Sequence, residues 1–509
     1  MFVGRDYQLE LLSSVWDKES SSLVVVSGRR RIGKSTLVEH FAEKSRCRFL
    51  EIEGLPPDEN MTNERQLANF CERLGKSAQM EVPQAKNWAE AFDYLEKAIA
   101  GKGKVIVFLD EISWMGGYDE GFAGFLKNAW DLQFSKRKRL VLVLAGSVSA
   151  WIQRNILNSK GFVGRISIDL NLTELPLSAC CGFWGRRAAH VSMREMVDVL
   201  SVTGGIPKYL QEVNPRLSTD ENIRRMCFLP EGYLFKDFNS IFSDVFGESV
   251  AAKRRILNIL ADGPASVSEL AKAMSIEPNG HITDDLNDLV VAGFVAAGAG
   301  LNPITGAKVR EVRYRLCDNY TRFYLKFILP RREAIRQGLY RFTDLESLPG
   351  WNSMLGLQFE NLVVNNLAPL CRELGLGRKL VTSAAPYARR KSASCPGLQI
   401  DLLIQTPKSV YVVEVKRCNR IEASIENEIE EKVSLLGIGS GKSVRTALVY
   451  EGKLSPEVEE NGFIDFLIPF SRLVDASAEP PALHVNDPRR PPTRFLSCRG
   501  RLHSGTRRS

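Results

Sequence analysis

Short apolar runs alternate with segments of helical spacing along the first third of the chain. The runs cover residues 23–26, 49–52, 105–109 and 140–144 and consist mostly of Val, Ile, Leu and Phe. Runs of this length and composition are typical of strands that are buried on both faces of a sheet. Because such strands alternate with helices, the pattern predicts an α/β fold with a parallel sheet.

The pattern becomes mostly helical from residue 169 to residue 247, with a helix-breaking corner at the sequence GGIP, residues 204–207. From residue 248 to residue 318, three short segments of helical spacing precede a stretch that resembles a hairpin. A Gly ends the first of these helices and a Ser opens the second. Three short helices followed by a hairpin predict a winged helix-turn-helix.

A second, smaller α/β unit is predicted towards the C-terminus. An aromatic and basic helix precedes it, and strands are expected at 399–405, 409–416 and 446–450. The sequence then becomes rich in Pro and Arg and loses all periodicity, which predicts a disordered basic tail. We therefore divide the chain into six parts, which are residues 1–168, 169–247, 248–318, 319–350, 351–472 and 473–509.

The composition is that of a globular protein with several cores. The 509 residues are 44% hydrophobic and 25% charged, and a chain of this length is expected to form about three domains. No run reaches the roughly 18 apolar residues of a membrane helix, and no apolar signal region follows the N-terminus. We therefore expect no membrane partner and a cytoplasmic location.

The cysteines and the net charge exclude only a few kinds of site and partner. The ten cysteines are scattered without a C-x-x-C, so neither a disulfide framework nor a zinc site is expected. Seven arginines and three acidic residues after position 474 contribute +4 of the formal net charge of +8. The rest of the chain is only mildly basic, which is weak support for nucleic acid as a partner.

The sequence SGRRRIGKST, residues 27–36, matches the phosphate-binding pattern G-x-x-x-x-G-K-[ST]. Glycines at both ends let backbone N–H groups curl around phosphates, and the following helix points its positive end at them. Lys34 is expected to reach the β- and γ-phosphates, and Ser35 to offer its hydroxyl to Mg²⁺. The side chains of Arg29, Arg30 and Arg31 would point to solvent or to a partner. The predicted loop residues are Gly28, Arg29, Arg30, Arg31, Ile32, Gly33, Lys34, Ser35 and Thr36.

Two acids close the apolar run at 105–109 and supply the second half of a nucleotide site. Asp110 would lie in the Mg²⁺ shell, and Glu111 would polarise the attacking water. Ser147 follows another run and would either sense the γ-phosphate or cap a helix. Arg165 would either stabilise charge at the γ-phosphate, within its own chain or in a neighbouring copy, or serve as a structural arginine.

Paired acids and a lysine form a second candidate site in the last α/β unit. Glu414 and Lys416 are two residues apart on one predicted strand and so share a face. A tight hairpin would bring Asp401 alongside them, and Glu360 on the preceding helix would add a third acid. Such a group can bind Mg²⁺ and activate water against a phosphodiester. The alternative is a set of charges at the ends of surface strands.

The order of these segments resembles a family of prokaryotic P-loop ATPases, related to the AAA+ and STAND groups, with a restriction-endonuclease-like C-terminal domain. The resemblance covers about residues 1–470 and rests on FVGRDYQLELL, SGRRRIGKSTLVEHF, VIVFLDEISWM, LAGSV, GRISIDLNLTELPL, TGGIPKYL, DFNSIFSDVFGES, LCDNYTRFYLKFILPRR, LGLQFENLVVNNL and QIDLLIQ with VYVVEVK. The Pro/Arg tail departs from the family pattern.

The resemblance implies a fold and a set of site residues. The fold is a P-loop parallel sheet with a helical lid, then a winged helix, then a small restriction-endonuclease-like α/β domain. ATP is implied rather than GTP, because no guanine-reading N-K-x-D is visible. The implied nucleotide site is Gly28, Gly33, Lys34, Ser35, Thr36, Asp110 and Glu111. The implied nuclease-like residues are Glu360, Asp401, Glu414 and Lys416.

Three functions fit these observations. The first is a slowly hydrolysing ATP switch that repositions the winged helix and the nuclease-like domain. The second is an ATP-gated, Mg²⁺-dependent DNA nuclease in defence or repair. The third is a non-catalytic regulator, in which the winged helix binds DNA and the last domain is a scaffold. A protein partner or self-association fits each of them.

The winged helix itself does not favour DNA. Its third helix carries Asp284, Asp285 and Asp288 and no Lys or Arg, so phosphates would be repelled from that face. We therefore expect a protein-docking or intramolecular role for this helix. The wing keeps DNA contact open through Lys308, Arg310, Arg313 and Arg315.

Overall fold

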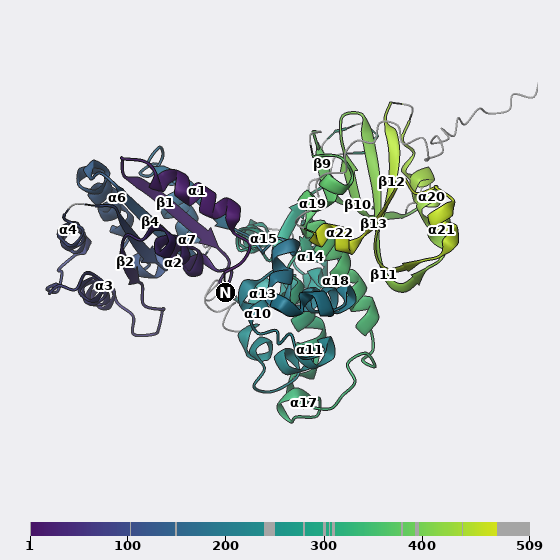
Figure 1. Ribbon diagram of the computed structural model, residues 1–509, viewed down its shortest axis with the longest axis horizontal. Coiled ribbons are helices and arrows are strands. Elements are labelled where there is room, and N and C mark those ends of the chain that lie inside the picture. The colour runs from purple at the N-terminus through teal and green to yellow at the C-terminus, as the bar shows by residue number, and fades with distance from the viewer. Residues whose placement is uncertain are drawn as a thin grey trace, which may run out of the picture.

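The computed structural model describes residues 2–101, 103–147, 150–238, 250–277, 280–298, 302–304, 306–307, 311–377, 380–391, 396–439 and 441–475. Two five-stranded sheets lie towards opposite ends of the molecule, with helices and a small three-stranded sheet between them (Figure 1). The predicted α/β fold class is confirmed.

The N-terminal sheet is parallel throughout, with strand order β2-β3-β4-β1-β5. Each of the four predicted runs lies in one of its strands. The fifth, β5, is an edge strand in which only part of one face is buried, so no apolar run marks it. The strands are β1 (Ser22–Gly28), β2 (Arg48–Glu53), β3 (Val105–Asp110), β4 (Leu140–Ser147) and β5 (Ile166–Leu172).

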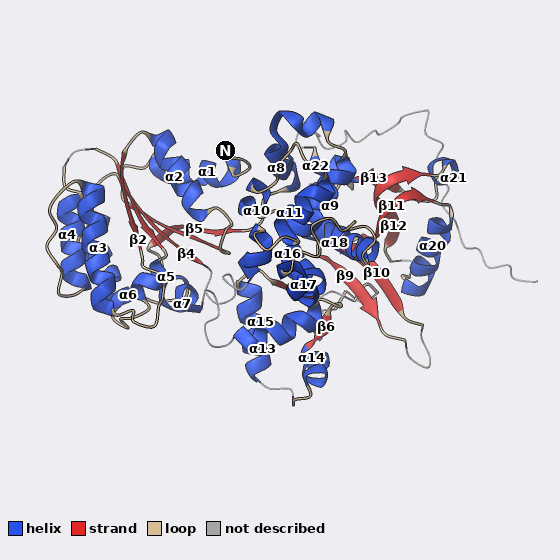
Figure 2. Cartoon of the chain, turned by 90° about the horizontal axis from the view of Figure 1, so that it is seen from below, coloured by secondary structure: helices blue, strands red, loops and turns tan. Residues whose placement is uncertain are grey.

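Helices cover both faces of this sheet (Figure 2). Successive residues of a strand pack into two separate cores, one on each face, as in a parallel sheet with both faces covered. Val24 and Phe108 pack on the side of α1 (Asp6–Trp16) and α2 (Lys34–Ser45). Val25 and Val107 pack on the other side, which is covered by α3 (Asn63–Ala78), α4 (Trp88–Ala98), α5 (Ile112–Gly116), α6 (Phe122–Leu132) and α7 (Ala150–Ile152).

The segment after β5 is helical, as expected, and turns sharply at the predicted corner. Gly204 has a φ of 58°, and Pro207 occupies the first turn of α10, where its missing N–H costs nothing. The helices are α8 (Leu177–Cys180), η3 (Cys181–His190), α9 (Met193–Thr203), α10 (Pro207–Gln211) and α11 (Thr219–Cys227).

Three helices and a three-stranded antiparallel sheet of order β6-β8-β7 follow. The elements are α13 (Val250–Leu260), β6 (Ala265–Ser266), α14 (Val267–Met274), α15 (Gly280–Val291), β7 (Val295–Gly298) and β8 (Arg313–Leu316). Lys308 and Arg310 lie outside the described residues. A helical connector leads on through α16 (Asn319–Phe323), η5 (Tyr324–Ile328), η6 (Leu329–Arg331) and α17 (Arg332–Arg336).

The C-terminal sheet is mixed, with strand order β13-β12-β11-β10-β9. β10 is antiparallel to β9 and β11, whereas β11, β12 and β13 run parallel. All three strands predicted here are confirmed. The elements are α18 (Trp351–Asn365), α19 (Leu367–Glu373), β9 (Ser383–Arg389), β10 (Leu398–Gln405), β11 (Ser409–Ile421), α20 (Ser424–Leu436), β12 (Ser443–Leu454), α21 (Pro456–Glu460), β13 (Phe466–Pro469) and α22 (Phe470–Val474).

One boundary needs correction. The tail was expected to begin at residue 473, but residues 473 and 474 complete α22, where Leu473 is buried. An apolar pair just before the Pro-rich stretch thus continues the fold by two residues. Residues 476–509 lie outside the described part of the chain.

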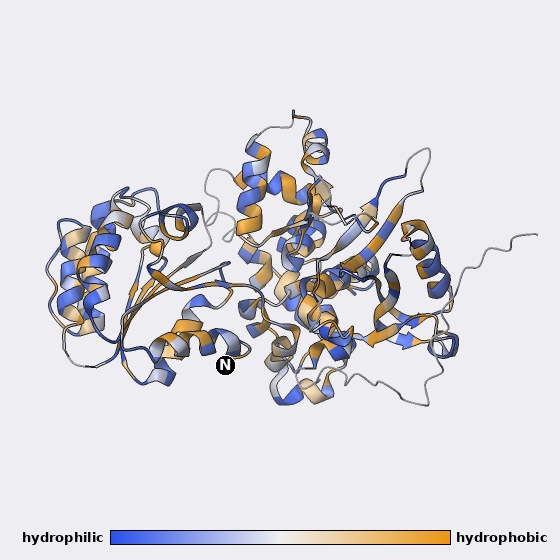
Figure 3. Cartoon of the chain, turned by 90° about the horizontal axis from the view of Figure 1, so that it is seen from above, coloured by the Kyte–Doolittle hydropathy of each residue, from blue (hydrophilic) through white to orange (hydrophobic). Residues whose placement is uncertain are grey.

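Shared cores join the parts of the chain. Apolar residues follow the strands of both large sheets (Figure 3). Val197 and Leu200 of α9 pack with Phe359 and Leu362 of α18 in one core, so the helical segment is fused to the C-terminal unit.

Within the described residues, no helix is long and apolar enough to cross a membrane. The eight cysteines described are free thiols.

Candidate functional site

The phosphate loop joins β1 to α2 and depends on its two glycines. Gly28 has a φ of 155°, and a Cβ there would lie only 2.7 Å from the carbonyl oxygen of Leu172 on β5. Gly33 has a φ of 90° as the residue before α2, a conformation that other side chains rarely adopt. The loop therefore curls at the end of a central strand and opens a helix, which is the context that phosphate binding requires.

Lys34 lies folded back over the loop. Its Nζ is 3.3 Å from the carbonyl oxygen of Gly28 and 3.4 Å from that of Arg29. Burial lowers the pKa of Lys34, while Glu111 and Asp110 act in the opposite direction. The ammonium group thus lies within the loop that would surround the phosphates.

The carboxyl ends of β1, β3 and β4 bring the predicted acids to the loop. Ser35 Oγ donates to Asp110 Oδ2 over 2.5 Å, and the amide of Ser147 donates to Glu111 Oε2 over 3.3 Å. Burial raises the pKa of Glu111. Because parallel strands end at one edge, residues far apart in sequence converge there. Residues 148 and 149 lie outside the described part, so both expectations for Ser147 stay open.

A cavity of about 290 Å³ lies beside the loop. Phe2, Val3 and Phe183 contribute an apolar wall, and Lys208 contributes a cation from α10. None of these four residues was identified as a site residue from the sequence, although the quoted segments FVGRDYQLELL and TGGIPKYL contain three of them. The lining is Phe2, Val3, Arg5, Arg30, Arg31, Ile32, Gly33, Lys34, Ser35, Thr36, Glu111, Leu175, Phe183, Pro207, Lys208 and Gln211.

Arg5 holds the loop in place from the N-terminal segment. Its guanidinium donates to the carbonyl oxygens of Ile32, over 3.1 Å, and Thr173, over 2.7 Å. The side chain is buried, and this burial lowers its pKa to about 10. Arg5 therefore connects the loop to the segment that follows β5.

Two of the three loop arginines, Arg29 and Arg31, contact later segments of the chain. The side chain of Arg29 is buried, forms an ion pair with Asp318 and lies 4.3 Å from the ring centroid of Phe294. The expectation that it points to solvent or to a partner molecule is wrong, because the following domain covers this loop. Arg31 forms an ion pair with Asp237 and a hydrogen bond with Tyr233 of the helical segment.

The ion pair of Arg29 leads into a buried polar network. Asp318 caps α16 by accepting the amide of Thr321 over 2.5 Å. Next to it, Asn319 accepts from Asn361 of α18 over 2.6 Å, and Arg322 donates to Gln358 of α18 over 2.8 Å. The loop is thus connected to α18 through the ion pair of Arg29 with Asp318 and through the hydrogen bonds of Asn319 and Arg322.

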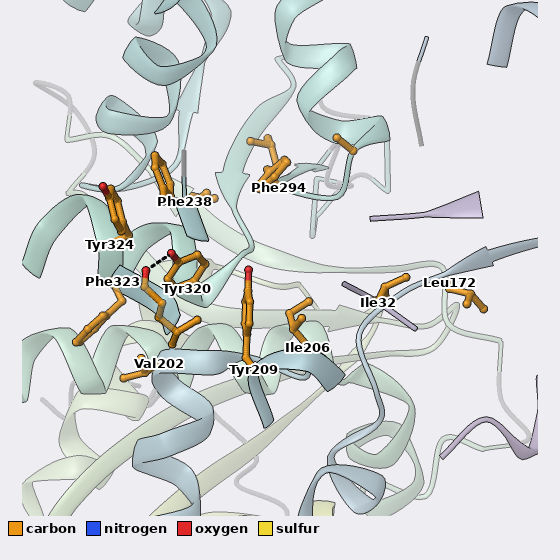
Figure 4. Close-up of a cluster of buried hydrophobic side chains, with 14 of the residues drawn as sticks. Ile32, Leu172, Val202, Ile206, Tyr209, Phe238, Phe294, Tyr320, Phe323 and Tyr324 are labelled. Carbon is orange, nitrogen blue, oxygen red and sulfur yellow. Dashed lines mark hydrogen bonds between the residues drawn. The ribbon is translucent and has the colours of Figure 1, made fainter. Parts of the chain in front are cut away.

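Aromatic side chains enclose this network. Tyr209, Phe238 and the connector residue Tyr320 belong to the buried cluster that also contains the loop residue Ile32 (Figure 4). Tyr320 donates to the carbonyl oxygen of Leu234 over 2.5 Å, and its ring stacks edge-on against Tyr209 at 4.9 Å. Because such packing excludes water, the polar contacts inside it act at low effective dielectric.

The second group of predicted residues converges on β10, β11 and α18. Asp401 Oδ2 accepts the amide of Val415 over 2.9 Å, which places it beside Glu414. The Glu414 side chain is buried, and burial together with the charge of Asp401 raises its pKa to about 8. The same two causes raise the pKa of Glu360 to about 7. The hairpin expected from the sequence therefore brings Asp401 beside Glu414, and Glu360 on α18 interacts electrostatically with Asp401.

Two further residues of this group were missed in the sequence. Glu428 and Lys432 come from α20, and Lys432 Nζ lies 2.7 Å from Glu414 Oε2 and 2.8 Å from Glu428 Oε1. Lys416 Nζ is 3.0 Å from Glu428 and 3.9 Å from Glu414. Glu428 and Lys432 are four residues apart on a helix, and this spacing could have indicated that they share a face.

The acids do not form a cage of three metal ligands. Among the described residues, no group of three or more His, Cys, Asp or Glu side chains is placed to hold a metal ion. Asp401 and Glu414 remain a pair of carboxylates, and Mg²⁺ often binds to one or two carboxylates together with substrate oxygens. The donor set fits that simpler arrangement.

Arg165 lies at the wrong end of the sheet for its own nucleotide site. It precedes β5, whose first residue Ile166 pairs with Leu23 at the start of β1, whereas the loop follows the end of β1. The two ends are about 20 Å apart at 3.3 Å per residue. Arg165 instead donates to Asp131 over 2.6 and 2.9 Å. The expectation for a site within one chain is therefore wrong, and the role in a neighbouring copy stays a prediction.

The parallel sheet, the glycine loop and the acids at the strand ends define a P-loop ATPase. Residues 2–213 match the model of a family described as an ATPase domain predominantly from Archaea. An uncharacterized protein of Methanocaldococcus jannaschii is 24% identical over 447 residues, which cover 86% of this chain and 93% of that protein.

Two further comparisons cover parts of the chain. A second Methanocaldococcus jannaschii protein, described as an uncharacterized ATP-binding protein, is 38% identical over 52 residues, or 10% of this chain and 88% of that protein. The Walker-type ATPase of Pyrococcus abyssi is 16% identical, with a TM-score of 0.49 over 64% of this chain and 95% of the other. The ATPase assignment rests on the family model and on the geometry of the loop.

Proposed function

We propose that this ATPase is a slowly hydrolysing molecular switch. A change of bound nucleotide at the phosphate loop would be transmitted to the acidic residues Asp401 on β10 and Glu414 on β11. One observation carries the proposal, the buried ion pair of Arg29 with Asp318. A loop that wraps around phosphates moves when they bind or leave, and Arg29 would transmit that movement to the first turn of α16. From there Asn319 and Arg322 reach α18, which carries Glu360.

Mg²⁺ belongs to the proposed nucleotide site. The hydroxyl of Ser35 and the carboxylate of Asp110 already lie 2.5 Å apart, and both are oxygen donors of the type that Mg²⁺ prefers. A bound Mg²⁺ ion would neutralise charge on the phosphates. Glu111, next to Asp110 at the strand end, would orient the attacking water, and Lys34 would contact the β- and γ-phosphates.

The nuclease-like reading of residues 351–472 remains part of the proposal. It is supported by Asp401 and Glu414 side by side and by two lysines above them. Glu360 would adjust the charge of this pair from α18. An ATP-gated, Mg²⁺-dependent DNA nuclease is the second candidate function. The buried Glu414 favours it, since its Oε1 atom has no hydrogen-bond partner among the described residues and a buried carboxylate oxygen left unpaired is costly.

The proposed winged helix at 248–318 acts within the chain rather than on DNA. Asp285 and Asp288 of α15 both form ion pairs with the buried Lys253 of α13, so structural contacts account for two of the three acids on this helix. Both arginines in the described part of the wing have partners within the chain. Arg313 forms an ion pair with Glu269, and Arg315 donates to Asn361 and Asn365 of α18. We propose that this unit relays the nucleotide state, with 169–247 as the helical lid and 319–350 as the connector.

A cleavage assay tests the proposed function. Supercoiled, linear and single-stranded DNA are incubated with Mg²⁺ or Mn²⁺, with and without ATP, using the wild type, Asp401→Ala and Lys34→Ala. The switch coupled to a nuclease predicts cleavage that Asp401→Ala abolishes and that Lys34→Ala makes insensitive to ATP. Cleavage by the Asp401→Ala variant at the wild-type rate would contradict the nuclease-like reading.

A further inference from the structure

The ammonium group of Lys432 contacts two acidic side chains of the C-terminal unit, Glu414 and Glu428. Lys432 lies four residues after Glu428 on α20, so both side chains share one face of that helix. Its ammonium bridges Glu414 Oε2 at 2.7 Å and Glu428 Oε1 at 2.8 Å. Lys416 also bonds to Glu428, yet it stays 3.9 Å from Glu414. Of the two lysines, Lys432 is therefore the direct partner of Glu414.

Glu414 keeps one carboxylate oxygen without a partner among the described residues. Its side chain has no exposed surface, and its Oε1 atom has no hydrogen-bond partner among the described residues. An ionised carboxylate offers about four acceptor positions, and a buried one left unpaired is costly. Asp401 lies beside it and interacts with it electrostatically. The unpartnered oxygen and the neighbouring carboxylate therefore mark a place where a divalent cation would bind.

We infer that Lys432 is a built-in competitor of the divalent cation at Glu414, so that the metal binds weakly until a phosphodiester neutralises the lysines. This inference rests on the proposed nuclease-like site and adds its regulation. A divalent ion on Glu414 would lie next to the ammonium groups of Lys432 and Lys416, and like charges repel strongly at low dielectric. The anionic backbone of a nucleic acid removes that repulsion, so metal and substrate would bind together.

The test is Mn²⁺ binding to the full-length chain without nucleotide or nucleic acid, measured as free Mn²⁺ by electron paramagnetic resonance. Lys432→Met keeps the side-chain length but removes the charge, and we expect it to bind Mn²⁺ roughly ten-fold more tightly than the wild type. Lys432→Arg restores a cation and should return to wild-type affinity. Lys416→Met should change affinity less, because Lys416 is farther from Glu414.

Two controls separate this inference from the proposed site. Asp401→Asn should weaken Mn²⁺ binding in both the wild-type and the Lys432→Met background. If Asp401→Asn has this effect while Lys432→Met leaves the affinity unchanged, the competition is wrong and the metal site stands. If Asp401→Asn has no effect in either background, the metal site itself fails. Lys432→Gln replaces Lys432→Met if the latter does not fold, with the same increase expected.

Discussion

Arg29 in the phosphate loop and Asp318 at the start of α16 form a buried ion pair across 289 residues of sequence. The same carboxylate caps α16 through the amide of Thr321. One side chain therefore fixes both the loop and the first turn of a helix that contacts the C-terminal unit. The loop and the first turn of the helix therefore share one carboxylate.

Breaking that pair on one side should be worse than removing both charges. Arg29→Met leaves Asp318 as a lone buried charge, a change that typically costs about 3–5 kcal/mol. We expect the thermal unfolding midpoint of Arg29→Met to lie below that of Arg29→Met/Asp318→Asn. Differential scanning fluorimetry in the absence of nucleotide measures both. A double variant whose loss equals the sum of the two single losses would show that the pair is not coupled.

The loop lysine and the strand-end acid should separate binding from hydrolysis. Lys34→Ala removes the cation that we propose contacts the phosphates, so we expect loss of ATP binding in equilibrium titrations with a fluorescent ATP analogue. Glu111→Gln should still bind ATP but hydrolyse it roughly 10²–10⁴-fold more slowly, the usual contribution of a general base. Equal loss of binding in both variants would contradict the role given to Glu111.

Glu174 should make stability depend on pH. Burial, and then the charge of Asp318, raise its pKa to about 7. A carboxyl group with a raised pKa keeps its proton in the folded state after the unfolded chain has lost it, so folding stability falls as the pH rises from about 4.5 to 7. Glu174→Gln should flatten this fall in the unfolding midpoint. An equally steep fall in the variant would assign the effect to other groups.

Arg165 should be dispensable for nucleotide binding by its own chain. Its guanidinium bonds to Asp131, at the opposite edge of the sheet from the loop. We expect Arg165→Ala to bind ATP with unchanged affinity in the same titration, with Lys34→Ala as the control that fails to bind. A large loss of affinity in a dilute, monomeric sample would contradict the position of this residue.

Periodicity identified most of the scaffold but not its least apolar parts. The strands that contain Val107 and Leu142 are buried on both faces, so their runs are obvious in the sequence. β5 is an edge strand in which Ser167 and Asn171 are polar, and it carries no such run. The order of elements in the smaller α/β unit was equally clear, because turns and short strands alternate there.

The site was predictable where spacing fixes it and not where distant segments meet. Lys34, Ser35, Asp110 and Glu111 follow from loop chemistry and strand ends, and they lie together. Arg29 was not predictable, because nothing near it in sequence indicates that Asp318 will cover it. Tertiary packing also decides which lysine contacts Glu414.

We propose that the nucleotide state reaches the C-terminal unit through Arg29 and Asp318. The decisive measurement is hydrogen–deuterium exchange of Asn319–Phe323 and Trp351–Asn365, with and without ATP and Mg²⁺, in a Glu111→Gln background. We expect ATP to change the exchange of both helices, and Arg29→Met/Asp318→Asn, still binding ATP, to abolish the change. An identical ATP response in that variant, or none in the parent, would contradict coupling through this ion pair.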